Sequence, residues 1–320
     1  MKIVILGAGG AIGKTIARTM VARGDQVRVV GRNLLRLQRA FPDISIEPVE
    51  ADLRTTDDCA KAIEGMDAAV YAVGLKYSKK DFANYPKLME VFLSAADSSQ
   101  LKQLILVTGV YSYGIPQSDK VTETHPRNPV SVKGQFRKEQ EDLVLGAHNP
   151  NGLKTIVLRL PDFYGPEVDA SMANNIFNSA AVGNERVYLL GPIDKPHEFV
   201  FTPDVGPVVA DLMAKPEVFG SAYNFAGVDS ISIRDFTEQV FAIAGDVKPV
   251  YWVIKGLPLR FFGLFNPLLR EMIEMEYLLK TPVILDDSKL KRVLSNLKKT
   301  SYEEGIAQTI VGFRKRMVRT

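Results

Sequence analysis

The sequence predicts an α/β protein, a Rossmann-type doubly wound parallel sheet with a smaller C-terminal substrate-binding portion. Short β-branched runs alternate with helical stretches as far as Val157, and the first run ends in a glycine-rich turn followed by a helix. Beyond Pro161 the pattern becomes irregular and richer in proline and glycine, as in segments that shape a pocket. We therefore expect a sheet-forming domain over residues 1–160, with later segments returning to it, and a mainly substrate-binding portion over residues 161–320.

Strands and helices are expected at regular intervals along the first half of the chain. The runs that predict strands are Lys2–Leu6, Gln26–Val30, Ser45–Val49, Ala68–Ala72, Gln103–Val107 and Lys154–Leu158. The helical stretches between them include Lys14–Arg23, Thr56–Glu64, Ala83–Ser98 and Ser131–Gly146. Such alternation builds a parallel sheet covered on both faces. Ligands of these sheets bind beyond the carboxyl ends of the strands, so functional residues are expected in the segments that follow each strand.

The segment after the first strand has the spacing of a dinucleotide-binding loop. Its glycines form a G-x-x-G-x-x-G pattern with one further glycine inside it. Glycines let the backbone turn sharply and approach a pyrophosphate, whose charge then lies against the amide groups of the helix N-terminus. The alternative is a plain tight turn, but the surrounding βαβ unit favours a nucleotide site. The candidate cofactor-binding residues of this loop are Gly7, Gly9, Gly10, Ala11, Ile12 and Gly13.

The residue after the second strand indicates which dinucleotide is bound. An acidic residue there binds the ribose 2′-hydroxyl of NAD, whereas a basic one favours the 2′-phosphate of NADP. The chain has Gly31 followed by Arg32, whose guanidinium can make paired, charge-assisted bonds to a phosphate. We therefore expect NADP rather than NAD. The alternative is that Arg32 only begins the next helix in solvent.

Segments after the third and fourth strands complete the expected cofactor site. Asp52, which precedes Leu53, is placed to accept a hydrogen bond from the adenine amino group. Asp52 is equally placed to cap the helix that follows. The small residues Ala72, Val73 and Gly74 end the fourth strand and let the backbone lie close to the cofactor.

Composition excludes several classes of protein. The 320 residues are 46% hydrophobic, enough for a large core, and the net charge of +3 is too small to favour nucleic acid as a partner. The single cysteine, Cys59, rules out an internal disulfide and is expected to pack in the core. Three scattered histidines give no metal-ligand spacing. The N-terminus has the pattern of neither a signal peptide nor a membrane span, so a cytoplasmic location is expected.

Four further motifs follow the glycine loop. They are Ser112–Gly114 (VYG-like), Glu123–Pro129 (ExxPxxP-like), Leu158–Pro166 (LRPxxxYGP-like) and Phe199–Val205 (xxVxVxDV-like). Together with the loop they resemble the extended short-chain dehydrogenases/reductases of the NAD(P)-dependent epimerase/dehydratase superfamily, over about residues 1–300. The resemblance implies that Pro161, Asp162 and Phe163 line the nicotinamide end of the cofactor. It also implies a homodimer packed through helices near Ala83–Ser98 and Ser131–Gly146.

The residues that such enzymes use for proton transfer are replaced in this chain. The family's Tyr-x-x-x-Lys positions are occupied by Lys133 and Arg137, and its hydroxyl position falls on Gly109, one residue after Thr108. Lys133 and Arg137 share a helix face, and their repulsion would favour loss of a proton from Lys133. The pair resembles the Lys-x-x-x-Arg of isoflavone-reductase and NmrA-like members, some of which use that lysine in proton transfer. A solvated basic helix face is the alternative.

These features predict an NADP-dependent oxidoreductase or epimerase-like enzyme. Its substrate would be a small, apolar carbonyl, alcohol or activated alkene, with Lys133 as proton donor or acceptor. Lys133, Thr108 and Arg137 are the candidate catalytic residues, with Thr108 preferred over Tyr111 as the assisting hydroxyl. Thr108 and Lys133 are also expected to contact the cofactor. The alternative function is a non-catalytic, NADP(H)-sensing regulator of the NmrA-like kind.

Three remaining features lie in the C-terminal half. The apolar stretch Leu257–Leu269 is too short and too interrupted to cross a membrane. It is expected to form a lid over an apolar substrate, a subunit contact or part of the core. The basic segment Lys298–Arg319 is expected to be amphipathic surface. His197 is expected to lie exposed in a loop without a chemical role.

Overall fold

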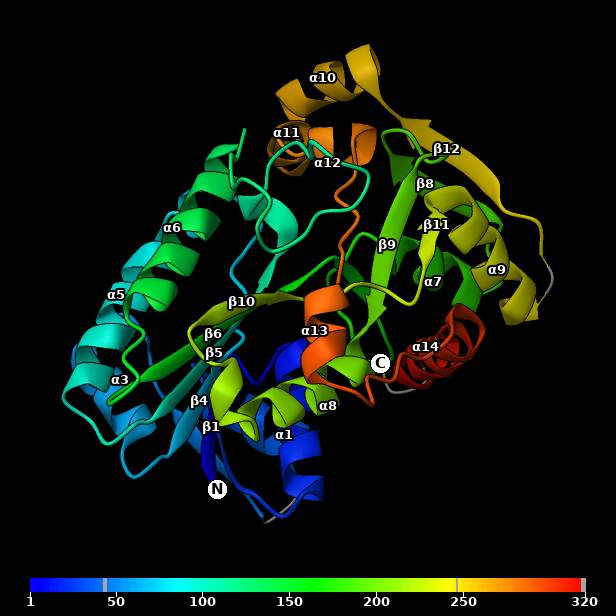
Figure 1. Cartoon of the computed structure of the whole chain (residues 1–320). Coiled ribbons are helices and arrows are strands. Elements are labelled where there is room, and N and C mark those ends of the chain that lie inside the picture. Colours follow the sequence, from blue (N-terminus) through cyan, green and yellow to red (C-terminus); the bar gives the residue numbers. More distant parts are fainter. Residues whose placement is uncertain (43–44, 246, 318–320) are drawn as a thin grey trace.

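Seven strands form one parallel sheet in the residues that the computed structural model describes, which are 1–42, 45–245 and 247–317. The strands are β1 (Lys2–Leu6), β2 (Gln26–Gly31), β3 (Ile46–Glu50), β4 (Ala68–Tyr71), β5 (Gln103–Gly109), β6 (Lys154–Leu160) and β10 (Ser221–Asn224). Their order is β10-β6-β5-β4-β1-β2-β3. Figure 1 labels the strands from β10 through β6, β5 and β4 to β1. The strand order reverses beside β1, between β2 and β4. Ligands of doubly wound sheets bind at such a reversal.

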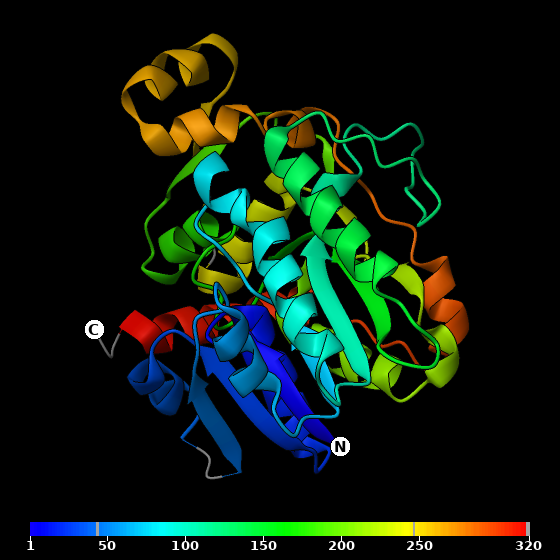
Figure 2. The ribbon, with the colours of Figure 1, turned by 90° about the vertical axis from the view of Figure 1, so that its left-hand side faces the viewer.

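Helices cover both faces of the sheet, and alternate strand residues feed two separate cores. Ile3 and Ile5 lie in the first core, while Val4 and Leu6 lie in the second, as the two-residue period of a strand requires. The first core includes residues of α1 (Ala11–Ala22), α2 (Leu34–Ala40), α8 (Thr202–Met213) and α13 (Ser288–Val293). The second includes residues of α3 (Thr56–Ile63), α5 (Asn84–Asp97) and α6 (Val132–Gly146), with Cys59 among them. Figure 2 shows α5 and α6 side by side over this second face.

The predicted fold class is confirmed, and each predicted strand lies in the sheet. The third strand begins one residue later than expected, at Ile46. The first helix begins three residues earlier than expected, at Ala11, because Gly10 already has extended N-cap geometry. Segments beyond residue 160 return to the sheet, since β10 pairs with β6 and α8 packs against α1. The domain boundary at residue 160 stays a prediction.

The C-terminal portion has two small sheets packed around an aromatic core. β7 (Asp162–Tyr164), β9 (Pro196–Phe201) and β11 (Ser230–Ser232) form one sheet, and β8 (Arg186–Leu190) and β12 (Val250–Ile254) form the other. The helices are α7 (Asn174–Ala181), α9 (Ile233–Gly245) and α14 (Tyr302–Met317). Buried rings of this core include Tyr164, Phe177, Phe199, Phe236, Tyr302 and Phe313. The basic C-terminal segment reaches α14, and Arg319 lies outside the described residues.

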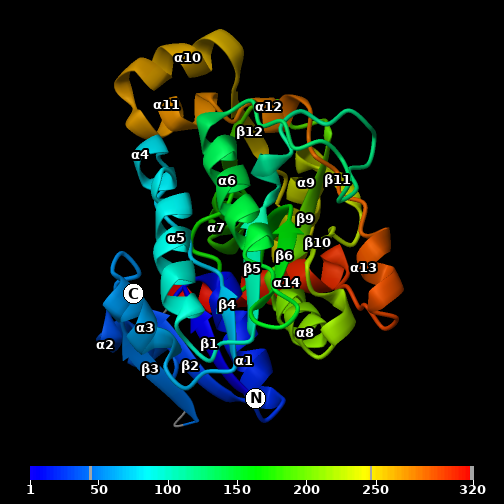
Figure 3. The ribbon, with the colours of Figure 1, turned by 60° about the vertical axis from the view of Figure 1, so that its left-hand side comes forward.

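A pair of short helices projects from the end of the molecule. α10 (Gly256–Phe265) and α11 (Pro267–Ile273) form this helical hairpin, which stands above α4 (Lys79–Phe82) in Figure 3. Arg270 joins its two helices by donating to the carbonyl oxygens of Gly263 and Leu264, at 3.2 and 2.9 Å. Most apolar side chains of Leu257–Leu269 are exposed. Core packing, one of the three readings of this stretch, is therefore wrong.

A buried ion pair joins α6 to the sheet. Fully buried Glu141 accepts two hydrogen bonds from the guanidinium of Arg159 in β6, at 3.0 and 2.8 Å. Ser112 donates to Glu141 at 2.9 Å, and Arg159 also donates to the Tyr113 hydroxyl at 2.9 Å. Tyr113 in turn donates to Asn224 of β10 at 2.8 Å. Burial opposes the charge of Arg159, but attraction by Glu141 outweighs it and raises the pKa of Arg159, so this guanidinium stays charged.

We expect Glu141→Gln to lower the free energy of unfolding by about 3–5 kcal/mol, because Arg159 would stay buried without its counter-ion. Urea-induced unfolding followed by circular dichroism measures the change. Asp142→Asn is the matched control, since the side chain of Asp142 is next on the same helix but 42% exposed. Its ion pairs should contribute about 1 kcal/mol or less. Equal losses in the two variants would contradict the role given to Glu141.

Candidate functional site

The glycine loop packs its backbone directly on the end of β4. Gly7 has a φ of +83°, and a Cβ atom there would lie 2.5 Å from the carbonyl oxygen of Ala72. A Cβ atom at Gly13 would lie 2.5 Å from the carbonyl oxygen of Gly7. By contrast, a Cβ atom at Gly9 would meet no atom of the described residues within 4 Å. Gly7 and Gly13 are therefore required by the contact of β1, α1 and β4, whereas Gly9 borders open space.

The N-terminus of α1 is open to an anion. Its N-cap is Gly10, and within the described chain neither a capping side chain nor a first-turn acidic residue satisfies the N–H groups that begin with Ala11 and Ile12. These N–H groups lie at the strand reversal beside β1, where a pyrophosphate would satisfy them. After β4, a Cβ atom at Gly74 would also meet nothing within 4 Å in the described structure. The residues present thus fit a dinucleotide.

The segments after β2 and β3 are positioned for the adenosine end. Arg32 is exposed after β2. A hydrogen bond from Arg54 is the main cause that lowers the pKa of Asp52, and the charges of Arg54 and Arg32 add to it. Asp52 does not cap the next helix, because Thr55 accepts the capping hydrogen bond of α3; that alternative is wrong. Leu53 turns into the core. Arg54 is a second cation here, although no motif in the sequence marks it.

Lys133 is fully buried in the first turn of α6. Its Nζ donates to the main-chain carbonyl of Glu271 at 3.0 Å and to Glu274 Oε2 at 2.9 Å, and it also pairs with the Glu271 carboxylate. An ammonium has three N–H donors, and these three acceptors match them. Burial opposes ionisation of Glu274, but the hydrogen bond from Lys133 outweighs it and lowers the pKa of that carboxyl. The surroundings of Lys133 therefore include the carboxylates of Glu271 and Glu274, which attract its ammonium, as well as the charge of Arg137, which repels it.

The spacing of residues in the sequence does not predict either glutamate as a partner of Lys133. They lie 138 and 141 residues after Lys133, in α11 and directly after it. Only the return of the helical hairpin to the end of α6 brings them to the lysine. The nearest signal in the sequence is the i, i+3 spacing of Glu271 and Glu274, which places two acids on one helix face.

Close packing holds the first turn of α6 against the turn after β5. Ser131 caps the helix by accepting from the Gly134 amide at 3.0 Å. A Cβ atom at Gly134 would lie 2.6 Å from the Tyr111 carbonyl oxygen, so glycine permits this approach to the 3₁₀ turn Val110–Ser112. Lys133 thereby lies over an aromatic face, with Nζ 5.1 Å from the Tyr77 ring centroid.

Two tyrosines and an aspartate form one cluster beside this lysine. Burial raises the pKa of Tyr77, and its contacts with Tyr111 and the charge of Asp162 add to the effect. Burial also raises the pKa of Tyr111, with Asp162 acting in the same direction and Arg137 opposing it. Both phenols therefore keep their protons at neutral pH and can donate hydrogen bonds. Tyr77 is absent from every motif, so the sequence does not reveal it.

The other two candidate catalytic residues have different environments. Thr108, near the end of β5, is 5% exposed, and its Oγ1 has no hydrogen-bond partner among the described residues. Buried hydroxyls in this state are uncommon and fit a site that awaits a ligand. Arg137 stacks on α5, with Cζ 3.5 Å from the Tyr85 ring centroid, and donates to Gln140 at 3.0 Å. Arg137 thus acts on the cluster through charge, while aromatic packing fixes its place.

His197 is buried in β9, so the expected exposed loop position is wrong. Its Nε2 lies 2.8 Å from Oδ2 of Asp162, because β7 and β9 pair side by side. The other ring nitrogen, Nδ1, has no partner in the described part of the chain. The motif residue Asp162 therefore joins an imidazole to the tyrosine cluster. Phe163 packs against the first core of the large sheet.

Comparison with known proteins agrees with this geometry. A family model described as NAD(P)H-binding matches residues 7–159. The UDP-glucose 4-epimerase of Lactobacillus helveticus is 26% identical over 210 residues, which cover 60% of this chain and 63% of that protein. The 3 beta-hydroxysteroid dehydrogenase/Delta 5-->4-isomerase of Mycobacterium tuberculosis is 22% identical over 314 residues, covering 87% and 81%. DesIV, a dTDP-glucose 4,6-dehydratase from Streptomyces venezuelae, has the same fold, with 19% identity, a TM-score of 0.82 and coverage of 100% and 98%.

Over residues 7–159 the chain matches an NAD(P)H-binding domain, and over most of its length it is similar to NAD-dependent epimerases and dehydratases, whose fold it shares. These similarities agree with the resemblance drawn from the motifs of the sequence. Two of the superfamily-like motifs are structural in this molecule, because Tyr113 and Arg159 both belong to the buried network of Glu141. Within the described residues, no helix is long and apolar enough to cross a membrane.

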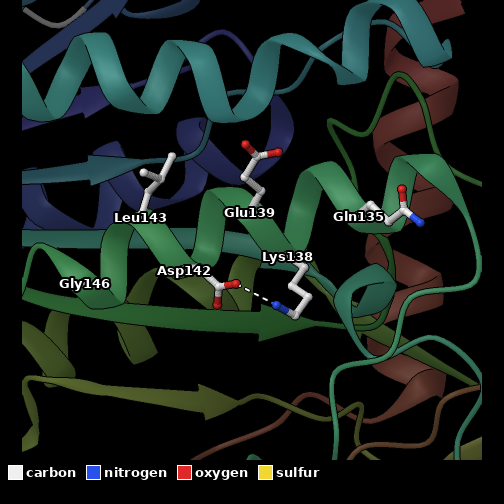
Figure 4. A pocket seen from close by; sticks show the side chains of 6 residues that line it. All are labelled: Gln135, Lys138, Glu139, Asp142, Leu143 and Gly146. Atoms are coloured by element: carbon white, nitrogen blue, oxygen red, sulfur yellow. Dashed lines mark hydrogen bonds and ion pairs between the residues drawn. The ribbon is translucent and has the colours of Figure 1, made fainter.

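The outer face of α6 carries a hollow of about 650 Å³ that contains none of the candidate catalytic residues. Its lining comes from one helix, namely Gln135, Lys138, Glu139, Asp142, Leu143 and Gly146. In Figure 4, Lys138 and Asp142 pair with each other at 2.8 Å. The superfamily resemblance implies a homodimer through α5 and α6, and this stays a prediction.

We expect Gly13→Ala to weaken binding of the nicotinamide dinucleotide at least about tenfold and to lower the free energy of unfolding by about 1–3 kcal/mol, because the added methyl group displaces the Gly7 carbonyl. Fluorescence titration with NADPH and urea-induced unfolding measure the two effects. Gly9→Ala is the matched control, since its methyl group has open space, and its unfolding midpoint should equal that of the wild type. Wild-type stability in both variants would refute the packing role of Gly13.

Proposed function

We propose that this protein is an NADP-preferring oxidoreductase of the superfamily, with Lys133 as its proton donor. The substrate we infer is a small apolar molecule with a carbonyl or alcohol group, or an activated alkene. The observation that carries the proposal is the buried ammonium of Lys133, which has three oxygen acceptors and lies over the Tyr77 ring at the position of the superfamily's catalytic tyrosine.

The cofactor would lie from the glycine loop to β7. Gly9 and the open N-terminus of α1 would hold its pyrophosphate, with Arg32 at the 2′-phosphate. Asp52, which keeps its negative charge, would stay with Arg54 and leave the exposed guanidinium of Arg32 for the phosphate. Bound NADP(H) supplies the hydride that is exchanged with a carbon of the substrate. Asp162 and Phe163 would border the nicotinamide end.

Proton transfer would use the groups around Lys133. In reduction of a carbonyl, the Lys133 ammonium gives one proton to the substrate oxygen as that carbon gains hydride, which leaves an alcohol and a neutral amine. Once the hairpin has returned to Lys133, a proton from water, passed by Glu271, restores the ammonium, because the Glu271 side chain is 22% exposed. Thr108 Oγ1 and the Tyr111 phenol would donate hydrogen bonds to the same oxygen. The reverse sequence describes oxidation.

The aromatic residues packed beside Lys133 would favour an apolar substrate once the site opens. Phe82, Tyr85 and Tyr111 form a ring cluster with centroids 5.0 to 6.2 Å apart, and Tyr77 joins Phe82 at 5.6 Å. Such surfaces bind apolar or aromatic groups better than a charged sugar nucleotide. The steroid-acting relative, which aligns with 87% of the chain, supports the same substrate class. Because Lys133 is fully buried and its Nζ is bound by Glu271 and Glu274, the hairpin must withdraw for substrate to reach the lysine.

We expect Lys133→Met to lower kcat for reduction of an apolar ketone about 100-fold or more, because the proton donor is lost, with Kd for NADPH changed less than about threefold. NADPH oxidation against a panel of apolar ketones and aldehydes identifies the substrate and gives kcat. Lys79→Ala is the matched control, since Lys79 also faces Glu274, at 3.8 Å, but is exposed. Its kcat should be unchanged.

Unchanged turnover in Lys133→Met would contradict the role of Lys133 as proton donor. NADPH binding without turnover of any compound in the panel would instead support the regulator alternative. The unfolding midpoint of each variant separates both results from loss of the fold.

We expect Arg32→Ala to weaken NADPH binding by about 10- to 100-fold and to leave NADH binding unchanged, because only NADPH carries the 2′-phosphate. Parallel fluorescence titrations with the two nucleotides measure this. Arg39→Ala is the control, as it removes an exposed cation at the far end of α2. A parallel loss of affinity for both nucleotides would contradict Arg32 as the phosphate-binding residue.

A further inference from the structure

The helical hairpin carries an exposed apolar cluster at the end of the molecule. Its members, here called the apolar tip, are Leu257, Phe261, Phe262, Leu264, Phe265 and Leu268, each between 48% and 79% exposed. The ring of Phe261 lies 5.7 Å from that of Phe262 and 5.5 Å from that of Phe265. Figures 2 and 3 show that the tip projects away from the sheet. A continuous apolar surface of this kind marks an interaction site.

The charged residues that directly precede the hairpin and those of the hairpin up to Arg270 are all cations. The segment from Val247 to Arg270 contains the cations Lys248, Lys255, Arg260 and Arg270 but no aspartate or glutamate. The helix α4, in which Lys79 and Lys80 are exposed and Asp81 is bound by Ser78, lies below the hairpin (Figure 3). The acids that follow the segment turn inward, because Glu271 and Glu274 hold Lys133 and Glu276 holds Lys280. The face presented to solvent is thus apolar and basic.

We propose that the apolar tip docks on an anionic lipid surface. An amphipathic helix with aromatic and aliphatic residues on one side and cations around it lies in the headgroup region, with its apolar side toward the acyl chains. α10 has this composition in ten residues, with Arg260 as its cation. The hairpin lies on the surface without crossing the bilayer, which agrees with its length.

Charge also decides against a second copy of this chain as the occupant. A two-fold contact is self-complementary, so it would bring the same patch of both molecules together. Lys255 and Arg260 of one copy would then approach those of the other, and the segment has no acid to pair with them. A surface of anionic headgroups has the complementary charge.

The adjoining two-stranded sheet continues this surface with interfacial aromatic residues. Trp252 of β12 and Tyr188 of β8 are register partners, 55% and 53% exposed, with ring centroids 6.2 Å apart. Tryptophan and tyrosine prefer the boundary between headgroups and acyl chains. Trp252 precedes the first residue of α10 by four positions and is the only tryptophan of the chain. Its fluorescence therefore reports on the surroundings of the hairpin.

The test uses the full-length protein with vesicles of phosphatidylcholine alone or mixed with phosphatidylglycerol. We expect the protein to sediment with the anionic vesicles at low salt, with a blue shift of Trp252 emission, and to bind neutral vesicles at least tenfold more weakly. Phe261→Ser with Phe265→Ser should weaken binding at least tenfold, as should Lys255→Glu with Arg260→Glu. Val182→Ser, which removes an exposed apolar side chain from the end of α7 (62% exposed), should bind as the wild type.

Several outcomes would overturn the proposal. One is no sedimentation with anionic vesicles at any lipid concentration, and another is equal binding by the Phe261→Ser/Phe265→Ser variant. Binding to both vesicle types with one affinity would refute the role of the cations. Self-association in sedimentation velocity, lost in the same double variant and without vesicle binding, would assign the tip to a second copy. NADPH affinity, which does not involve the tip, verifies that each variant is folded.

Discussion

The buried ion pair between Glu141 and Arg159 is the constraint on which the rest of the site depends. It joins α6 to β6 and, through Tyr113 and Asn224, to the turn after β5 and to β10. Breaking such a pair leaves an uncompensated charge in a low-dielectric interior. With α6 fixed in this way and Gly134 allowing close approach to the Tyr111 backbone, Lys133 has one possible place, at the edge of the tyrosine cluster.

Charge balance then explains why the helical hairpin folds back over the site. A buried ammonium requires acceptors for each of its N–H groups, and α6 itself supplies none to Lys133 among its described contacts. Glu271 and Glu274 provide them from the distant segment. The same contacts close the site, so the group that we propose to move a proton also holds the cover in place. Opening the cover and exposing Lys133 are therefore one event.

The helical hairpin has two sides with different chemistry. Its inner side carries the carboxylates that bind Lys133, and its outer side carries the apolar tip and the cations around it. An apolar substrate and a lipid surface are compatible, since compounds of that kind concentrate in membranes. A hairpin whose inner side binds Lys133 and whose outer side, as we propose, docks on lipid would connect the bilayer to the site. The cofactor half of the molecule is unaffected by this arrangement.

The sequence by itself determined the sheet, the glycine loop and the resemblance to the epimerases and dehydratases, because strand alternation, glycine spacing and ordered motifs are local patterns. It also singled out Lys133, Arg32 and Asp162. Tertiary structure alone decided the partners of these residues. Glu271 and Glu274 reach Lys133 across more than a hundred residues, and His197 meets Asp162 only through the pairing of β7 with β9. Local spacing encodes the backbone, whereas contacts between distant segments depend on how the chain packs, which no short pattern records.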